Sequence, residues 1–255
     1  MIGNSFLITE SCLVDQNMNI TDGTNEFISY LCKHKIPFLI LTNQSLLSNI
    51  QLAKKYKEAG IKAIKPEHFY TSTMAGIDLL LTQVPDKKVA GYIGTSTLKD
   101  TLRAGGFAVD LDYADYLFVG TDRHASYNDY CYALRLLKSG AMLLATDFSE
   151  VEYKDQTPLI GCGAIAKMLE VASNKKAVLL GMPNPNFPLQ ATVYLDVDRS
   201  NCIFVGAHLD SDIVCGLNAK LTTVILTAAM NDEENLFNSK IKPDYAVETM
   251  LGLLR

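Results

Sequence analysis

The sequence lacks an excess of basic residues, a CxxC pair and a long apolar run. Its 255 residues carry 23 Lys and Arg against 28 Asp and Glu, which gives a formal net charge of −5. Nucleic-acid-binding domains are normally basic, so we expect neither DNA nor RNA as a partner. The six cysteines form no zinc-finger pattern with His. They are typical of small core residues in a reducing compartment.

Membrane and export signals are also missing. No stretch approaches the about 20 apolar residues of a membrane span. The apolar run at residues 6–8 has no basic flank and is too short for a signal peptide. We therefore expect a cytoplasmic protein that does not bind membranes. A chain of this length corresponds to one or two domains, and no linker-like stretch divides it.

Short apolar runs alternate with amphipathic segments along most of the chain. Residues 26–35 and 46–58 repeat apolar side chains at helical spacing, and Gly60 follows the second segment as an expected C-cap. This alternation indicates an α/β protein with a mostly parallel sheet. The runs typical of buried strands are residues 6–8, 38–41, 89–93, 116–119, 142–145, 177–180, 202–205 and 223–226.

The residues that follow these strands are the first place to look for a site. In open α/β sheets, ligands bind beyond the carboxyl ends of the strands. Four such segments contain polar side chains, glycine or proline. They are residues 9–14, 42–45, 181–185 and 206–213.

Taken together, these segments resemble the haloacid dehalogenase-like (HAD) superfamily, and within it the NagD-like branch of sugar-phosphate and nitrophenyl-phosphate phosphatases. The resemblance covers nearly the whole chain. Segments 70–72, 119–123, 145–147 and 161–164 resemble the signposts of that branch's cap domain. The three motifs that carry it are Thr42-Asn43, similar to Thr-Asn-Asn; Gly181-Met182-Pro183, similar to Gly-Lys-Pro; and Gly206 with Ser211-Asp212-Ile213, similar to Gly-Asp-x-x-x-Thr-Asp-Ile.

The resemblance implies a Rossmann-like, parallel-sheet core with an inserted α/β cap. The core would comprise residues 1–77 and 180–255, and the cap residues 78–179. It also implies a chemistry in which one aspartate attacks phosphorus and a second, two residues later, acts as acid and base. A Thr and a Lys would hold the phosphoryl oxygens, and aspartates of the first and fourth motifs would hold Mg²⁺.

The first motif departs from the family pattern. An ungapped alignment back from Thr42 places Thr9 at the nucleophile position and Ser11 at the acid/base position. A register one residue earlier would place Ile8 and Glu10 there instead, and neither register supplies a nucleophilic aspartate. A Thr nucleophile would need an adjacent base. Ser11 offers none, and Glu10 would point to the other side of an extended segment.

The third and fourth motifs depart from it as well. Met182 stands where the lysine belongs, and a thioether carries no positive charge. Ala207 stands where a metal-ligand aspartate belongs, so Asp212 is the carboxylate that remains. One carboxylate is a poor site for Mg²⁺, which prefers hard oxygen ligands. Of the family's functional side chains, only Thr42 and Asp212 match.

Residues next to these motifs have a functional and a structural interpretation. His208, Asp210 and Asp212 could form a metal site of a new kind, but they are more typical of solvated residues at a loop and helix start. Cys12 could be a reactive thiol, although a small residue packed in a loop is the simpler interpretation.

These substitutions lead to two hypotheses about function. The first is a protein that has lost Mg²⁺-dependent phosphatase activity, needs no cofactor, and acts by binding a small phosphorylated metabolite or a protein partner. The alternative is an active, Mg²⁺-dependent phosphatase of a small phosphorylated metabolite, with the retained Thr42 in its site. In either case we expect Thr42, Asn43, Asp122 and Asp147 to contact the ligand. By similarity to the family, we expect a homodimer.

Overall fold

The computed structural model describes residues 5–15, 18–154, 156–230, 236 and 238–254, and two compact units divide the chain. The first unit comprises Met1–Thr42, Asn49–Tyr70 and Met182–Arg255, and the second comprises Asn43–Ser48 and Thr71–Gly181. Within the described residues, none of the helices has the length and apolarity needed to cross a membrane.

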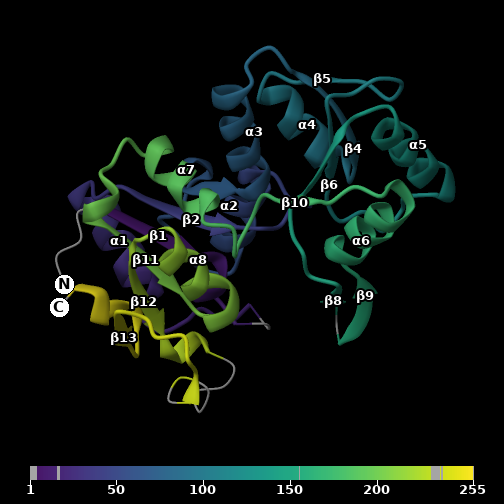
Figure 1. The fold of residues 1–255 in the computed structure, drawn as a ribbon. Helices are drawn as coiled ribbons and strands as arrows, with labels where there is room; N and C mark the ends of the chain where they lie inside the picture. The colour runs from purple at the N-terminus through teal and green to yellow at the C-terminus, as the bar shows by residue number, and fades with distance from the viewer. Residues whose placement is uncertain (1–4, 16–17, 155, 231–235, 237, 255) are drawn as a thin grey trace. The chain divides into compact units, whose positions relative to one another are not determined.

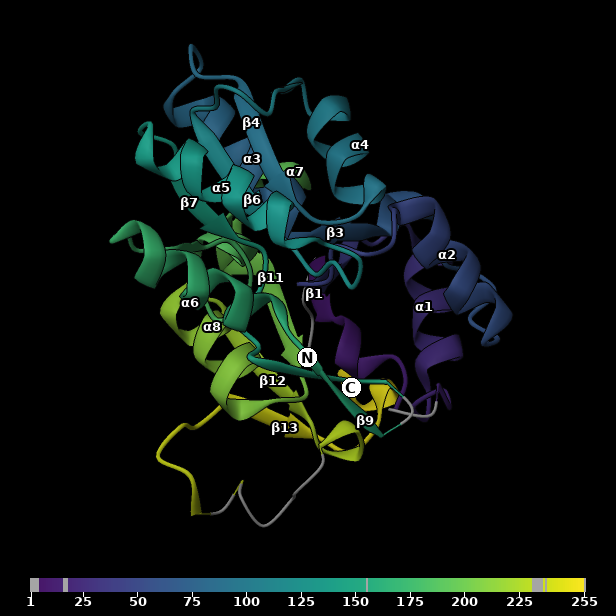
Figure 2. The same cartoon turned by 90° about the vertical axis from the view of Figure 1, so that its right-hand side faces the viewer.

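The first unit is built on a six-stranded sheet (Figure 1). The pairings of β1 with β2 and β11, of β11 with β12, and of β12 with β13 are parallel. Figure 2 shows β11, β12 and β13 side by side. In sheet order the strands are β13 (Tyr245–Val247), β12 (Thr222–Leu226), β11 (Cys202–Gly206), β1 (Ser5–Thr9), β2 (Phe38–Thr42) and β3 (Phe69–Thr71). The helices are α1 (Thr24–His34), α2 (Asn49–Glu58), α7 (Asn186–Tyr194) and α8 (Val214–Asn218).

Local sequence explains the elements of this unit. Every residue of β1 and β2 is buried, as expected for continuous apolar strands inside a parallel sheet. Helix α1 buries Phe27, Ile28 and Leu31 on one face, and Lys35, the C-cap residue after its end, adopts the left-handed conformation. Gly60 follows α2 with a φ of +112°, a conformation that favours glycine.

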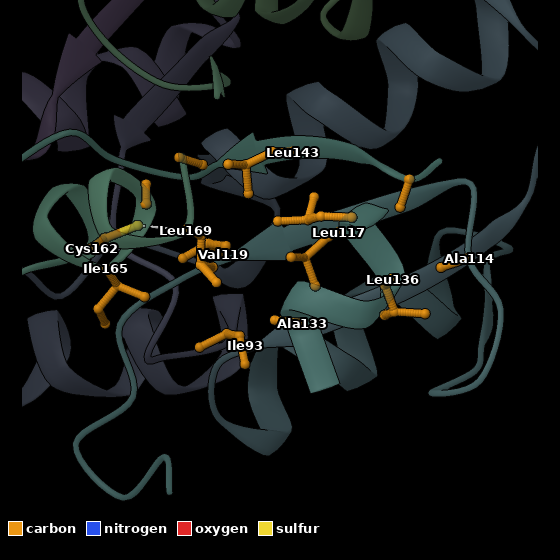
Figure 3. Close-up of a cluster of buried hydrophobic side chains, with 14 residues drawn as sticks. Ile93, Ala114, Leu117, Val119, Ala133, Leu136, Leu143, Cys162, Ile165 and Leu169 are labelled. Carbon is orange, nitrogen blue, oxygen red and sulfur yellow. Dashed lines mark hydrogen bonds between the residues drawn. The ribbon is translucent and has the colours of Figure 1, made fainter. Parts of the chain in front are cut away.

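The second unit has a five-stranded sheet with helices on both faces. Alternate residues of a strand point to opposite faces, so Leu117 of β6 packs with α5 and α6, while Phe118 packs with α3 and α4. Figure 3 shows the first of these clusters. In sheet order the strands are β10 (Val178–Leu179), β7 (Met142–Ala145), β6 (Tyr116–Val119), β4 (Val89–Ile93) and β5 (Ala108–Val109). The helices are α3 (Ser72–Gln83), α4 (Ser96–Ala104), α5 (Tyr127–Lys138) and α6 (Cys162–Ser173), and β8 (Val151–Lys154) pairs with β9 (Thr157–Ile160) in a separate antiparallel hairpin.

The predicted fold class, an α/β protein with parallel sheets, is confirmed. The units differ from the predicted domains in residues 43–48, 71–77 and 180–181, which group with the second unit. Packing explains part of the difference, because Ile77 and Leu180 belong to a buried cluster with Leu98 of α4. That the second unit acts as a cap stays a prediction.

Candidate functional site

Three adjacent parallel strands of the first unit bring their carboxyl ends together. Thr9, the last residue of β1, pairs with Leu41 of β2, and Ile8 pairs with Val205 of β11. Because these strands are parallel, the residues that follow them share one edge of the sheet. This edge holds the turn η1 (Glu10–Cys12) after β1 and the helical turn η4 (Leu209–Ile213) after β11.

A buried carboxylate organises one side of this edge. Asp212 is 2% exposed, and its Oδ2 accepts a hydrogen bond of 2.9 Å from the Thr9 hydroxyl and one of 3.1 Å from Ser11. The same oxygen accepts bonds from the backbone N–H groups of Ala207 at 3.0 Å and His208 at 3.2 Å. The other oxygen, Oδ1, accepts the Ser211 hydroxyl at 2.9 Å. The charge of Asp212 is therefore compensated by five donors.

The Asp212 network answers two points left open by the sequence. The interpretation of Asp212 as a solvated residue at a helix start is wrong, because the side chain is buried and hydrogen bonded. His208 and Asp210 on the same loop are exposed. A Thr9 nucleophile would need an adjacent base, and Asp212 lies in hydrogen-bond contact with the Thr9 hydroxyl. However, Thr9 is buried, with 1% of the residue exposed. Thr9 is therefore poorly placed to attack a substrate.

Glu10 faces a different set of partners. Its Oε2 accepts the hydroxyl of Thr42, and its Oε1 accepts the hydroxyl of Tyr56 from helix α2. Lys55 Nζ lies 3.9 Å from Oε1, and the Glu10 side chain is 22% exposed. Burial, then the charge of Glu10 and its hydrogen bond, hold the pKa of Tyr56 above its usual range, so this hydroxyl stays a donor. An anion is thus held here by two hydroxyls and one ammonium group.

Cys12 lies in the same turn and is fully buried. Its Sγ is 3.4 Å from the Thr9 hydroxyl. Burial raises the pKa of this thiol far above its usual range, and the charge of Asp212 adds to the effect. Cys12 is therefore a packing residue, and a reactive thiol is not expected at this position.

The donor set at this edge does not fit Mg²⁺. Magnesium takes octahedral oxygen ligands, and protein sites usually supply carboxylates for it. Among the described residues, no group of three His, Cys, Asp or Glu side chains is placed to hold a metal ion. Four hydrogen bonds already occupy Asp212 Oδ2, and Ala207 offers no side-chain ligand.

The remaining predicted ligand residues lie in the second unit. Asn43 Nδ2 donates to Asp147 Oδ1 at 3.1 Å, so these two are brought together. Asp122 accepts a 2.8 Å bond from the backbone N–H of His124 in its own loop. A Cβ added to Gly181 would lie 2.2 Å from Asn43 Oδ1, so the backbone passes close to this amide. Met182, in the first unit, is 8% exposed, and its family role stays a prediction.

Sequence reasoning missed the partners of Glu10. Tyr56 lies on the buried face of α2 with Leu52 and Ala53. A tyrosine on an apolar helix face needs a partner for its hydroxyl, which was the available signal. The identity of that partner could not be inferred, because periodicity does not tell where a residue in a short turn points.

The fold and this edge define a class: a parallel-sheet α/β protein with polar loops at the carboxyl ends of β1, β2 and β11. Residues 12–108 match the family described as haloacid dehalogenase-like hydrolase, and residues 179–253 match that described as HAD-hydrolase-like. The chain is 30% identical over 235 residues to an acid sugar phosphatase of Staphylococcus saprophyticus, covering 92% of this chain and 90% of the relative. The chain belongs to the HAD-like hydrolase family, in its NagD-like branch.

Solved structures agree with this assignment. A mutant of the thermostable p-nitrophenylphosphatase of Bacillus stearothermophilus is 27% identical with a TM-score of 0.87, covering 98% of this chain and 97% of that one. A glycerol phosphate phosphatase of Mycobacterium tuberculosis, solved with magnesium, shares the fold at 21% identity and a TM-score of 0.88, covering 99% and 76%.

These comparisons overturn the first functional hypothesis. The expectation of a protein that has lost phosphatase activity and acts only by binding is wrong. The relatives that match along the chain are named as phosphatases, and none of the comparisons points to inactivity. The substitutions at the motif positions are thus not sufficient grounds for inferring loss of activity.

Proposed function

We propose that this protein is a phosphatase that hydrolyses a phosphomonoester of a small metabolite. The observation that carries the proposal is the 30% identity to an acid sugar phosphatase across 92% of the chain. The hydroxyl-rich edge around Thr42 supports it, because hydroxyl and ammonium groups are suitable ligands for phosphoryl oxygens.

The proposed roles follow from the chemistry of each side chain. The hydroxyl of Thr42 has one proton, which it donates to Glu10, and on binding of substrate it would donate this proton to a phosphoryl oxygen instead. In the second unit, Asn43 and Asp147 offer an amide and a carboxylate, and Asp122 offers a carboxylate. Such groups can hydrogen-bond the hydroxyls of sugars or polyols, and we expect them to contact the ligand.

Magnesium has no step in this proposal. The family implies the ion, and one structural relative contains it. The residues of this chain do not fit it, for the reasons given by the Asp212 network. Without the ion, the positive charge near the phosphoryl group has to come from a side chain. Lys55 is the candidate, because its Nζ lies 3.9 Å from Glu10 Oε1 at this sheet edge.

Two further properties belong to the proposal. All six cysteines are free, which supports a reducing, cytoplasmic location. The expectation of a homodimer is based on similarity to the family. Size-exclusion chromatography coupled to light scattering would test it by measuring the molar mass in solution.

The proposal is tested by phosphate release from a panel of sugar phosphates, glycerol phosphates and p-nitrophenyl phosphate. We expect turnover of at least one of them, and a loss of at least tenfold in kcat/KM for Thr42→Val, which is isosteric. The control is Thr82→Val, since the exposed Thr82 hydroxyl only bonds its own helix at Asp78. Release no faster than the blank for every substrate would overturn the proposal.

A further inference from the structure

We propose that Glu10 is the nucleophilic carboxylate of this phosphatase and that Lys55 supplies the positive charge for the phosphoryl group. The inference rests on the proposed function and names the residues of its central step. In the ungapped register, the family positions are those of Thr9, Ser11 and Met182, and the proposal places the chemistry on Glu10 and Lys55 instead.

Two carboxylates are held by the hydroxyls of this sheet edge, and one is unavailable for attack. Asp212 Oδ2 accepts four hydrogen bonds, Oδ1 accepts a fifth, and 2% of the residue is exposed. A carboxylate that is buried and accepts five hydrogen bonds is poorly placed to attack phosphorus. Moving the carboxylate toward a substrate would leave these buried donors unpaired, which is costly.

The other carboxylate, Glu10, is available. Its side chain is 22% exposed, so a small anion can reach it. Each of its oxygens accepts one hydroxyl, from Thr42 and from Tyr56, and a carboxylate oxygen can accept about two such bonds. One lone pair per oxygen therefore remains. Carboxylates of either Asp or Glu serve as nucleophiles that form covalent intermediates.

The position of Glu10 also matches the substrate. Thr42, which would hold a phosphoryl oxygen, contacts Glu10 directly. A phosphoryl group bound by Thr42 would therefore lie next to the Glu10 carboxylate. Tyr56 is a positioning residue, because its hydroxyl holds Oε1 from the buried face of α2.

Lys55 completes the arrangement with a charge. Its Nζ lies 3.9 Å from Glu10 Oε1 and 5.3 Å from the ring centroid of Tyr56. A carboxylate that attacks a phosphate dianion meets like-charge repulsion, and a neighbouring ammonium group reduces it. Met182 brings no charge to this role. Lys55 is 40% exposed at its side chain, which leaves it free to swing to a phosphoryl oxygen.

The reaction balances with water as the only co-reactant. A Glu10 oxygen forms a bond to phosphorus while the bond from phosphorus to the ester oxygen breaks. The leaving alcohol keeps that electron pair and takes a proton from water. A second water then attacks the phosphorus of the acyl phosphate and gives a proton to the hydroxide left from the first water, which releases inorganic phosphate and restores the Glu10 carboxylate.

Helix α2 offers a matched control for both residues. Lys54 and Glu58 form an ion pair of 3.8 Å on the same helix, with side chains that are 76% and 68% exposed. Glu58→Gln and Lys54→Met remove the same charges as Glu10→Gln and Lys55→Met, away from the sheet edge. Both controls are expected to keep the wild-type kcat/KM within twofold.

The test uses the best substrate of the panel and the full chain. We expect Glu10→Gln to lower kcat at least 100-fold. Lys55→Met is expected to raise KM at least tenfold, and Lys55→Arg to recover most of that loss. Acid quenching of the wild type with ³²P-labelled substrate should leave a hydroxylamine-sensitive label on the peptide that contains Glu10.

The outcomes separate this inference from the proposed function. An inactive wild type overturns both. An active wild type with unchanged activity in Glu10→Gln, or with the acid-stable label on another residue or on none, overturns the inference alone. The label is measured on the wild-type protein, so the result stands even if a Glu10 variant does not fold.

Discussion

Thr9 and Asp212 lie 203 residues apart in the sequence, and the hydroxyl of the first donates a 2.9 Å hydrogen bond to the carboxylate of the second. The bond joins the end of β1 to the turn after β11, two strands that pair in parallel. Glu10, the residue after Thr9, faces Thr42 and Tyr56 instead. The sheet edge therefore holds two carboxylates: Asp212, which is buried and accepts five hydrogen bonds, and Glu10, which is partly exposed.

The buried carboxylate of Asp212 should contribute to the stability of the fold. Asp212→Asn removes a buried charge that accepts five hydrogen bonds, and bonds to charged groups contribute more than neutral ones. We expect a loss of about 2–3 kcal/mol in the free energy of unfolding, measured by urea denaturation. The exposed neighbour Asp210 is the control, and Asp210→Asn should stay within about 0.5 kcal/mol of the wild type. Equal losses in the two variants would contradict the assignment.

The raised pKa of Tyr56 predicts a pH dependence of stability. Burial is the main cause of the shift, so the folded state keeps the phenol proton at a pH where the unfolded chain has released it. The contribution is complete below pH 10.0, the ordinary value for the group, and is lost as pH rises above it. Above pH 10.0, we expect the free energy of unfolding of the wild type to fall with pH more steeply than that of Tyr56→Phe, by about 1.4 kcal/mol per pH unit.

The control for this slope is Tyr127→Phe, because Tyr127 is 82% exposed. Its pH dependence should match the wild type. Denaturant midpoints at several values of pH, from neutral to above the ordinary pKa of tyrosine, give the comparison. Parallel curves for the wild type and Tyr56→Phe would show that the Tyr56 hydroxyl is not held as described.

Thiol reactivity tests the burial of Cys12. Only the thiolate reacts with alkylating reagents, and burial keeps the Cys12 thiol protonated. Iodoacetamide at mildly alkaline pH, read by peptide mass spectrometry, should modify the partly exposed Cys131 at least 100-fold faster than Cys12. After unfolding in guanidinium the two rates should converge. Comparable rates in the folded protein would contradict the described turn.

Chelation tests the argument about magnesium. Because Asp212 is occupied by hydrogen bonds and position 207 is alanine, we expect phosphate release to change less than twofold between EDTA and added MgCl₂. Calorimetric titration with MgCl₂ should show no binding heat at the sheet edge. Loss of activity in EDTA, with recovery on adding Mg²⁺, would overturn this part of the account.

The central strands were predictable from the sequence because their signal is strong. The predicted bounds of β4, β6 and β7 agree with the structure, since each is a short, largely apolar run. The hairpin of β8 and β9 was missed because each strand has only four residues and the apolar side chains Val151, Tyr153 and Ile160 are exposed, so no buried face marks it. Strands β3, β5 and β13 have two or three residues, too few to show a period.

The candidate site was predictable to the level of the sheet edge. Parallel strands bring Thr9, Thr42 and the residues after Gly206 to one edge, and the sequence shows which strands those are. The direction of Glu10 was not predictable in detail. Residues 10–12 form a helical turn and not the expected extended segment, and the contact with Tyr56 depends on the packing of α2.

Steady-state phosphate release by the purified full chain is the most direct test of the central claim. Measured on the sugar phosphate and glycerol phosphate panel beside Thr42→Val and Glu10→Gln, it should show turnover by the wild type that both variants lose. Release that does not exceed the blank would contradict the claim. Release that is equal in the wild type and both variants would also contradict it, because the activity would then not come from this sheet edge.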